Sequence, residues 1–407
     1  MKRNLGNVLI GQSGGPTAVI NQSLVGIVET CLESKKIGRI LGAVQGIQGV
    51  LKNEIIDLGR ESRRTLEAVA RTPCAALRSV RKKPNEDECA QILHRIEELD
   101  IHAFFYIGGN DSAETAHLID QMARADGWEL HLFHVPKTID NDLRVTDHCP
   151  GYGSAAKFVA HAMLGDNEDN RSLPGIKIDV IMGRNAGWLT AASLLARRSE
   201  SDGPHLIYVP ERSFSLEKFL GDVDRVYRKH GRCLVAVSEG IHKTDGSPLV
   251  GGDEKDSHGN VQLSGSGALG DFLAAQIKSR LGAKLRVRAD TFGYLQRSFA
   301  GLASEVDAHE AREVGRVAAA AAIAAKTTSG SIAIRRKKKS EYTVAYDVIE
   351  LAQVAKSTRP LDERFILGDN DIAPDFLDYV TPLVGKLPKT AHLSDHPLGA
   401  FTRSEVQ

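Results

Sequence analysis

The chain has 407 residues, of which 42% are hydrophobic and 26% charged, a composition typical of a globular protein too long for one small core. Its 52 lysines and arginines balance 52 aspartates and glutamates, so no overall charge would attract nucleic acid or a membrane surface. We therefore expect two or three domains and neither a nucleic-acid nor a membrane partner, and any phosphate chemistry must come from local clusters.

The cysteines and the apolar runs bear on the compartment. Five scattered cysteines, none in a CxxC pair, argue against a disulfide framework and against a zinc site. The first residues lack the apolar core of a signal peptide, and the longest near-apolar run, Val317–Ala325, is too short to cross a bilayer. The sequence thus predicts a cytoplasmic protein.

Short apolar runs alternate along the chain with longer amphipathic ones. The predicted strands are Asn7–Gly11, Arg39–Val44, Ala103–Ile107, Leu130–Val135, Ile178–Met182, Leu206–Val209 and Cys233–Val237. The predicted helices are Thr17–Cys31, Glu86–Glu98, Ala113–Ala125, Ser154–Met163, Trp188–Arg198 and Leu216–His230. This alternation predicts an α/β fold with mostly parallel sheets covered by helices on both faces.

The later segments are less regular. Gly251–Asn260 is predicted to be a polar loop, and Ser264–Ile277 a glycine turn followed by a helix. Ser331–Arg336 and Glu341–Val348 read as a hairpin whose tip is Lys337–Ser340. The run IRRKKK in this hairpin could be a nucleic-acid or nuclear-import patch, but a solvated tip is favoured in a chain of zero net charge.

Six predicted strands end in glycine and in charged or amide residues: GQSGGP, GGNDS, PKTIDND, GRNAG, PER and SEG. Ligands of parallel α/β sheets bind at the carboxyl ends of the strands. Turn chemistry explains one such end, but it is a weak explanation for six.

The segment GQSGGP contains Gly14 and Gly15, which allow a ligand to approach the backbone, and a helix is predicted to follow. It is neither a Walker motif nor GxGxxG, and a plain strand-to-helix turn explains it equally well. In GGNDS, Asn110 and Asp111 would lie beside bound phosphate, which requires Mg²⁺ between carboxylate and phosphate, although two helix-capping residues are the simpler explanation.

PKTIDND is the most specific of these segments. Lys137 supplies a positive charge for phosphoryl oxygens and Thr138 supplies a hydroxyl. Of Asp140 and Asp142, one could accept a proton from an attacking hydroxyl and the other could hold Mg²⁺ through water. An Asx-rich turn explains one aspartate but not the lysine as well.

Further charged or polar residues lie at other strand ends and turns: Arg81, Arg184, Glu239, Arg288, Tyr294 and Arg297. Arginine suits a phosphate or a sugar hydroxyl, although each such residue alone is more often a surface ion pair. Together the motifs predict a phosphoryl-transfer enzyme, in which positioning and charge neutralisation supply most of the catalysis.

The ordered set GQSGGPTAVIN, GGNDS, PKTIDND, GYGSA, MGRNAGW, SEG and GYLQR resembles the phosphofructokinases over about residues 5–300. In that family a glycine after GGD and a glycine in PGTIDND mark the ATP-dependent members. An aspartate and a lysine there mark the pyrophosphate-dependent branch, and here these positions are Asp111 and Lys137. Glycine would leave room for the α-phosphate of a nucleotide, whereas Asp111 would fill that space and Lys137 would add a cation for pyrophosphate.

The resemblance implies reversible transfer of phosphate from pyrophosphate to fructose 6-phosphate, giving fructose 1,6-bisphosphate and phosphate in glycolysis or gluconeogenesis. Asp140 resembles the base that deprotonates the C1 hydroxyl, Arg81 resembles an arginine that stabilises the transferring phosphoryl group, and Lys137 and Asp111 complete the catalytic set. Gly14, Gly15 and Lys137 resemble the pyrophosphate-binding residues. The residues that resemble the sugar-phosphate pocket are Thr138, Ile139, Asp140, Met182, Gly183, Arg184, Glu239, Tyr294 and Arg297.

The resemblance also implies a metal, an assembly and a domain division. Mg²⁺ would be held by Asn110, Asp111 and Asp142, with Asn110 standing where the family has an aspartate. Arg288 resembles an arginine that reaches the pocket of a neighbouring subunit, which implies a homodimer or a homotetramer. Each of two three-layer α/β/α domains would be discontinuous: residues 1–145 plus 265–305 for pyrophosphate and Mg²⁺, and residues 146–264 plus 306–407, with the hairpin and tail, for fructose 6-phosphate.

Several alternatives stay open. An ATP-dependent 6-phosphofructokinase is disfavoured by Asp111 and Lys137, and a non-catalytic sugar-phosphate-binding regulatory subunit is disfavoured by the presence of Asp140. A Rossmann dehydrogenase is disfavoured because no GxGxxG opens a strand–helix–strand unit. Sedoheptulose 7-phosphate stays open as a second acceptor.

Overall fold

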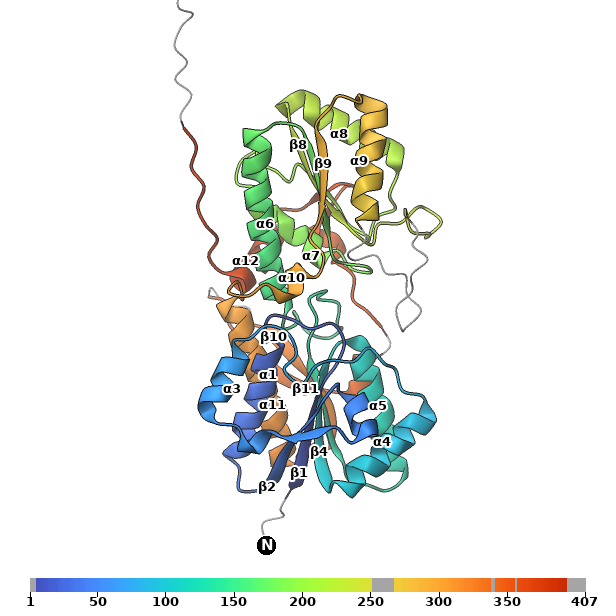
Figure 1. The fold of residues 1–407 in the computed structure, drawn as a ribbon, viewed down its shortest axis with the longest axis vertical. Helices are drawn as coiled ribbons and strands as arrows, with labels where there is room; N and C mark the ends of the chain where they lie inside the picture. Colours follow the sequence, from blue (N-terminus) through green and yellow to red (C-terminus); the bar gives the residue numbers. More distant parts are fainter. Residues whose placement is uncertain (1–4, 251–266, 338–340, 356, 394–407) are drawn as a thin grey trace, which may run out of the picture.

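A computed structural model describes residues 5–250, 267–337, 341–355 and 357–393. The strands in this part of the chain form one seven-stranded sheet, one four-stranded sheet and a two-stranded ribbon. Figure 1 shows the two larger sheets in separate α/β lobes, one above the other. The predicted α/β fold with mostly parallel sheets is confirmed.

The seven-stranded sheet has the order β11-β10-β5-β4-β1-β2-β3. Its central strands run parallel, whereas the edge strands β3 and β11 are antiparallel to their neighbours. The bounds of these strands are β1 Gly6–Gln12, β2 Ile37–Ala43, β3 Ile55–Asp57, β4 Ile101–Gly108, β5 His131–Pro136, β10 Ser329–Arg336 and β11 Val344–Ile349.

Helices cover both faces of this sheet (Figure 1). Their bounds are α1 Ile20–Leu32, α2 Ile47–Lys52, α3 Arg63–Ala70, α4 Glu86–Glu98, α5 Asn110–Ala125 and α11 Glu305–Ala324, with a 3-10 turn at Leu58–Arg60 and another at Leu351–Gln353. One apolar core joins the sheet to α1, α3 and α11, and a second joins it to α2, α4 and α5.

The four-stranded sheet is parallel throughout and has the order β7-β8-β6-β9. Its strands are β6 Ile176–Ile181, β7 Leu206–Tyr208, β8 Cys233–Ser238 and β9 Val287–Thr291. Its helices are α6 Tyr152–Ser172, α7 Trp188–Ala191 with a 3-10 turn at Ala192–Ala196, α8 Leu216–His230, α9 Ala268–Leu281, α10 Leu295–Ser298 and α12 Phe376–Val384. The ribbon of β12 Ile366–Leu367 and β13 Asp371–Ile372 follows a 3-10 turn at Glu363–Phe365 and precedes α12.

Local sequence signals explain the best-predicted helices. Helix α4 begins after a capping box, in which the Asn85 side chain accepts from the Glu88 N–H and the Glu88 side chain accepts from the Asn85 N–H. Helix α8 begins after Ser215, whose hydroxyl accepts from the Lys218 N–H, and ends at Gly231 with a φ of 69°. Both helices have the predicted bounds.

The region of Trp188–Arg198 differs from the single helix that was predicted. The structure has four α-helical residues, Trp188–Ala191, followed by a 3-10 turn over Ala192–Ala196. Every residue from Trp188 to Ala196 is buried, so tertiary packing and not amphipathic periodicity sets the backbone here.

The predicted domain division is wrong in its later half. Strand β9 lies within residues 265–305 but pairs with β6 in the four-stranded sheet. Strands β10 and β11 lie within residues 306–407 but extend the seven-stranded sheet beside β5. The chain therefore passes between the sheets after β5, after β9 and again after β11, since strand pairing is a long-range property that no local motif encodes.

None of the helices in the described part of the chain combines the length and the apolar character that crossing a membrane requires. The predicted polar loop at Gly251–Asn260 and the predicted hairpin tip at residues 338–340 lie outside the described residues.

Candidate active site

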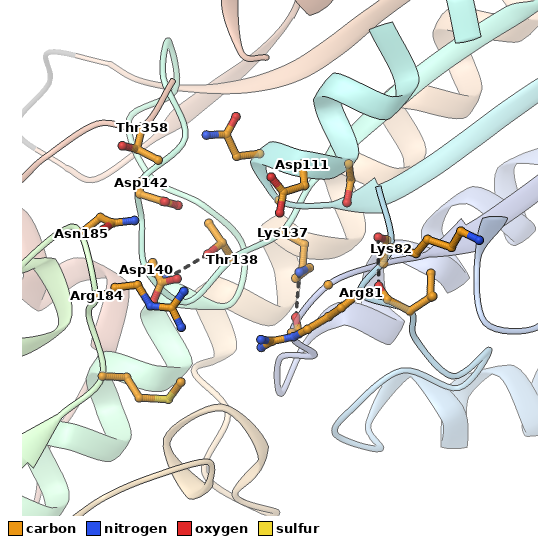
Figure 2. Close-up of a pocket in the computed structure, with 18 of the residues that line it drawn as sticks. Arg81, Lys82, Asp111, Lys137, Thr138, Asp140, Asp142, Arg184, Asn185 and Thr358 are labelled. Atoms are coloured by element: carbon orange, nitrogen blue, oxygen red, sulfur yellow. Dashed lines mark hydrogen bonds between the residues drawn. The ribbon is translucent and has the colours of Figure 1, made fainter. Parts of the chain in front are cut away.

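A cavity of about 390 Å³ opens where strands of both larger sheets end. Figure 2 shows charged side chains from both lobes pointing into it. The residues that line it are Ser13, Gly14, Gly15, Val80, Arg81, Lys82, Gly109, Asn110, Asp111, Ser112, Lys137, Thr138, Asp140, Asp142, Met182, Arg184, Asn185, Glu239, Tyr294 and Thr358. Thirteen of the predicted site residues are among them.

The glycine loop after β1 lies against two cations. Gly14 has a φ of +75°, and a Cβ there would lie 3.0 Å from the Lys137 Nζ. A Cβ on Gly15 would lie 2.6 Å from the Arg297 Nη1 and 3.6 Å from an Arg81 nitrogen. Any side chain at Gly15 would thus displace a guanidinium group, so the loop needs glycine for close approach.

The helix after this loop does not supply the phosphate cradle that its position predicted. Helix α1 begins only at Ile20, and the Gly14 N–H donates to the Val80 carbonyl at 2.9 Å. Positive charge at this end of the cavity therefore comes from the side chains of Lys137, Arg81 and Arg297.

Lys137 is the central cation of the cavity. The residue is only 3% exposed, and its Nζ donates to the Gly15 carbonyl at 2.7 Å (Figure 2). Burial and the nearby Arg297 lower the pKa of Lys137 to about 8, although Asp140 acts in the opposite direction. A bound anion would therefore stabilise the charged form of Lys137.

Asp140 and Asp142 follow Lys137 on the same loop. Burial raises the pKa of Asp140, and Lys137 and Arg184 partly offset this increase. Burial and the neighbouring Asp140 raise the pKa of Asp142 to about 7. A carboxylate whose pKa is raised towards neutrality is a better proton acceptor than an ordinary aspartate.

The shape of this loop is fixed by its own residues. The Asp140 N–H donates to the Thr138 hydroxyl at 3.1 Å. Asn141 has a φ of 56°, and its side chain donates to the Tyr379 hydroxyl and accepts from the Cys149 N–H. Ile139, predicted in the sugar-phosphate pocket, instead buries its side chain in the core beneath the second sheet. An apolar anchor between polar residues holds the loop in place.

The loop after β4 brings amide and carboxylate oxygens to the cavity. Asn110 is the first residue of α5, and its buried Oδ1 has no hydrogen-bond partner among the described residues. Asp111 follows it and is exposed on the cavity wall. With Asp142 these residues form a set of oxygen donors, the ligand type that Mg²⁺ requires, and the orphaned Asn110 oxygen fits a hard cation.

The second lobe contributes the opposite wall. The loop after β6 carries Met182, Arg184 and Asn185, and Gly183 within it has a φ of +145°. The Ser238 hydroxyl at the end of β8 donates to the Gly183 carbonyl at 2.6 Å, which places Glu239 beside this loop. Figure 2 shows the Arg184 guanidinium beside Asp140.

Tyr294 and Arg297 come from the segment after β9. The Arg297 guanidinium lies over the Tyr294 ring, 4.5 Å from its centroid. Burial and the neighbouring Arg81 lower the pKa of Arg297, which does not itself line the cavity but lies behind Gly15. A bound anion would relieve the repulsion between these two arginines.

Arg288 lies apart from the cavity of its own chain. It is exposed on the edge strand β9, where its Nη1 donates to the neighbouring Val287 carbonyl. A role in catalysis would therefore require a second copy of the chain.

Sequence reasoning missed several lining residues. Ser13, Gly109, Ser112, Asn185 and Lys82 lie within or beside segments that were singled out, so their neighbours signalled them. Thr358 comes from the C-terminal part of the chain, which has no motif, and only the three-dimensional structure brings it to the cavity.

Comparisons with known proteins agree with this geometry. The profile of the family described as phosphofructokinase matches residues 7–326. A pyrophosphate–fructose 6-phosphate 1-phosphotransferase of Rhodospirillum rubrum is 48% identical over 397 residues, covering 96% of this chain and 97% of that protein. The corresponding protein of Xanthomonas campestris is 38% identical, covering 96% and 94%. The crystal structure of a pyrophosphate-dependent phosphofructokinase from Marinobacter aquaeolei superposes with a TM-score of 0.84 at 33% identity, covering 96% and 94%.

Proposed function

This chain belongs to the phosphofructokinase family, and we propose that it transfers phosphate reversibly from pyrophosphate to the C1 hydroxyl of fructose 6-phosphate, giving fructose 1,6-bisphosphate and phosphate. The single observation that carries the donor choice is the position of Asp111 and Lys137 on the wall of one cavity, beside the glycine loop. The similarity to pyrophosphate-dependent relatives over nearly the full chain supports the same conclusion.

We assign donor binding to the positive end of the cavity. Lys137 and Arg81 lie beside Gly14 and Gly15, where they would neutralise the charge of pyrophosphate. Because Lys137 is buried and tied to the Gly15 carbonyl, it would meet the phosphate in a fixed position. Asp111 would occupy the space that a nucleotide's α-phosphate needs and would repel it.

We assign the acceptor to the opposite wall. Thr138, Met182, Arg184, Glu239 and Tyr294 offer hydroxyl, cationic and carboxylate groups for a sugar phosphate. Arg184 and Arg297 would bind the 6-phosphate and Glu239 would accept from sugar hydroxyls, with Gly183 shaping the loop. This arrangement would present the C1 hydroxyl to Asp140.

Asp140 would then accept the proton of the C1 hydroxyl as that oxygen attacks the transferring phosphorus atom. The bond from C1 oxygen to phosphorus forms, the bridging bond of pyrophosphate breaks, and orthophosphate leaves. Arg81 and Lys137 would stabilise the negative charge that is shared between the attacking and leaving oxygens. In the reverse direction the protonated Asp140 returns its proton to the sugar oxygen.

Mg²⁺ is part of this proposal, held by Asn110, Asp111 and Asp142. Bound there, it would neutralise phosphate oxygens and draw charge from the leaving group. The amide of Asn110 would be a weaker ligand than a carboxylate, so the two aspartates would carry most of the binding.

The assembly and the compartment are proposals of the same kind. We expect a homodimer or a homotetramer, because Arg288 lies exposed on an edge strand and away from its own cavity. We expect the cytoplasm, because the five cysteines are free thiols and four of them are buried.

The deciding experiment measures fructose 1,6-bisphosphate formation from fructose 6-phosphate and Mg²⁺, with pyrophosphate in one reaction and ATP in another. Product with pyrophosphate alone is the expected result. Product with ATP alone would be consistent with the fold and with Asp140 as the base, but it would contradict pyrophosphate as the donor. No product with either donor would favour a regulatory subunit.

Exchanging the two donor-specific residues tests the reason for that choice. We expect the double variant Asp111→Gly with Lys137→Gly to lose at least about tenfold in kcat/KM for pyrophosphate and to gain measurable use of ATP. The matched control Lys82→Met removes another lysine of the cavity and should leave the donor preference unchanged. A double variant that prefers pyrophosphate as strongly as the wild type would contradict the account.

A further inference from the structure

Residues 357–361, which we call the strap, run between the two lobes behind the cavity. Thr358 lines the cavity and forms an antiparallel bridge with Leu143, just after the loop that carries Asp140. The Ser357 hydroxyl accepts from the Arg144 side chain at 3.1 Å. A segment near the C-terminus is therefore hydrogen-bonded to the loop that follows β5.

Arg359 makes the most extensive contacts of the strap. Its Nη2 donates to the Asn141 carbonyl at 2.8 Å, and its Nη1 donates to the Thr146 and Asp147 carbonyls at 2.6 and 2.9 Å. Its backbone N–H donates to the Asp142 carbonyl at 2.6 Å. A planar guanidinium donates from two separate nitrogens at fixed angles, whereas all three N–H groups of an ammonium lie on one nitrogen.

The other side of the strap contacts the loop that carries Arg184. The Arg359 guanidinium lies over the Trp188 ring, 4.6 Å from its centroid, and the Trp188 Nε1 donates to the Arg359 carbonyl at 3.4 Å. Two residues on, the Leu361 N–H donates to Glu211 Oε1, which also accepts from the Gly187 N–H. The strap thus contacts Trp188 directly and Gly187 through Glu211, as well as residues 141–147.

We propose that Arg359 is a positioning residue, which fixes the loop that carries Asp140 relative to the loop that carries Arg184. The inference rests on the proposed function, in which Asp140 accepts a proton from a sugar held by Arg184. These two loops come from different sheets, and the strap contacts the segments that adjoin both of them. Their separation therefore depends on what ties the loops together from behind, and an error of about 1 Å in such a distance costs on the order of 100-fold in rate.

The test compares Arg359→Ala and Arg359→Lys with the wild type in the pyrophosphate assay. We expect kcat to fall about 10- to 100-fold in both variants, because alanine has no donor and the single nitrogen of lysine cannot replace two guanidinium nitrogens. The KM for pyrophosphate should change by less than about threefold, because the hydrogen bonds of the strap among the described residues go to residues 141–147, Trp188 and Glu211 and not to the glycine loop. Added guanidinium ion should restore part of the kcat of Arg359→Ala and none of that of Arg359→Lys.

The matched control is Arg364→Ala. Arg364 belongs to the same part of the chain, lies over an aromatic ring and pairs with Asp362, but its side chain is 69% exposed. Its kcat should stay within about twofold of the wild-type value. Thermal unfolding of all variants shows whether each is folded at the assay temperature. If Arg359→Ala is unfolded there, the kcat of Arg359→Lys alone decides the test.

A second readout does not depend on activity. Trp128 and Trp188 are the two tryptophans of the chain, so Trp128→Phe leaves Trp188 as the only one. In that background, Arg359→Ala should change the Trp188 emission, whereas Arg364→Ala should not. Variants of Arg359 with wild-type kcat would overturn the proposal, as would a fall in kcat matched by Arg364→Ala. A wild-type enzyme that is inactive with pyrophosphate would overturn the proposed function instead, while the emission change would still report the tie between the loops.

Discussion

At the scale of single residues, Asp140 is the group on which the proposed reaction depends most directly. We expect Asp140→Asn to lower kcat by about 10²- to 10⁴-fold, because an amide cannot accept the proton of the C1 hydroxyl. Binding of fructose 6-phosphate, measured by calorimetry, should change by less than about threefold, because the pocket residues are unchanged. The surface variant Asp224→Asn on α8 serves as a control of the same chemistry. An Asp140→Asn enzyme with wild-type kcat would require another base.

The pKa of Lys137 predicts how kcat/KM for pyrophosphate depends on pH. Since its pKa is lowered to about 8, the ammonium is present below that pH and is lost above it. The kcat/KM for pyrophosphate should therefore fall as the pH rises through about 8, approaching tenfold for each further unit.

The comparison enzyme for this pH profile is Lys137→Arg, whose guanidinium stays charged throughout the range. Its alkaline limb should move to higher pH, while the ionisation of pyrophosphate itself affects both enzymes equally. If the two profiles share the same alkaline limb, a group other than Lys137 controls it.

At the scale of elements, the crossing of α1 and α11 supports the first lobe. A Cβ on Gly26 would lie 2.2 Å from the Arg312 carbonyl oxygen, and one on Gly315 would lie 2.2 Å from the Ser23 carbonyl oxygen. The two helices approach this closely only because both positions are glycine. The contact places α11 so that β10 can follow it into the sheet beside β5.

We expect Gly26→Ala to lower the free energy of unfolding by about 2–3 kcal/mol, because the methyl group would force the helices apart. The control is Gly221→Ala in the middle of α8, where a Cβ meets nothing within 4 Å. That change should raise the free energy by about 0.5–1 kcal/mol, since alanine favours a helix. Urea unfolding of both variants measures the difference, and equal effects of the two substitutions would contradict the close-packing argument.

Elements with local signals were predictable from sequence, and elements fixed by distant contacts were not. The capping box of α4 and the cap residues of α8 mark their bounds in the sequence itself. The Ser304 cap marks the start of α11, but no local signal marks the return of the chain to the first sheet, because the packing of α11 on α1 sets its place. Thr358 and Arg359 could not be predicted for the same reason. Their place in the site follows from the third passage of the chain between the sheets, after β11, which no local sequence signal locates.

At the scale of the whole molecule, two sheets share one cavity and each supplies what the other lacks. The first lobe brings the glycine loop, Lys137 and Asp140, and the second brings Arg184 and Glu239. Because the chain passes three times between the sheets, the two walls are held by covalent connections as well as by packing. This arrangement can keep acceptor and donor aligned in a site that catalyses both directions.

Arg288 extends this argument from one chain to an assembly. It is exposed on β9, the edge strand of the second sheet, so its proposed role is to complete the pocket of a neighbouring copy. Arg288→Ala alone should raise the KM for fructose 6-phosphate by at least about tenfold, because a phosphate-binding cation is lost. Arg286→Ala, close by and paired with Asp169 in its own chain, is the control and should behave like the wild type.

Mixing two defective chains separates a contribution across subunits from one within the chain. Asp140→Asn and Arg288→Ala subunits, unfolded together and refolded at equal amounts, form hybrid dimers in about half of the cases. In a hybrid, the site of the Arg288→Ala chain keeps its own Asp140 and receives Arg288 from the other subunit, whereas the second site lacks both groups. One site in two is then restored in half of the dimers, so the mixture should recover about a quarter of the wild-type activity. Recovery no greater than the average of the two separate variants would mean that Arg288 serves no neighbouring site.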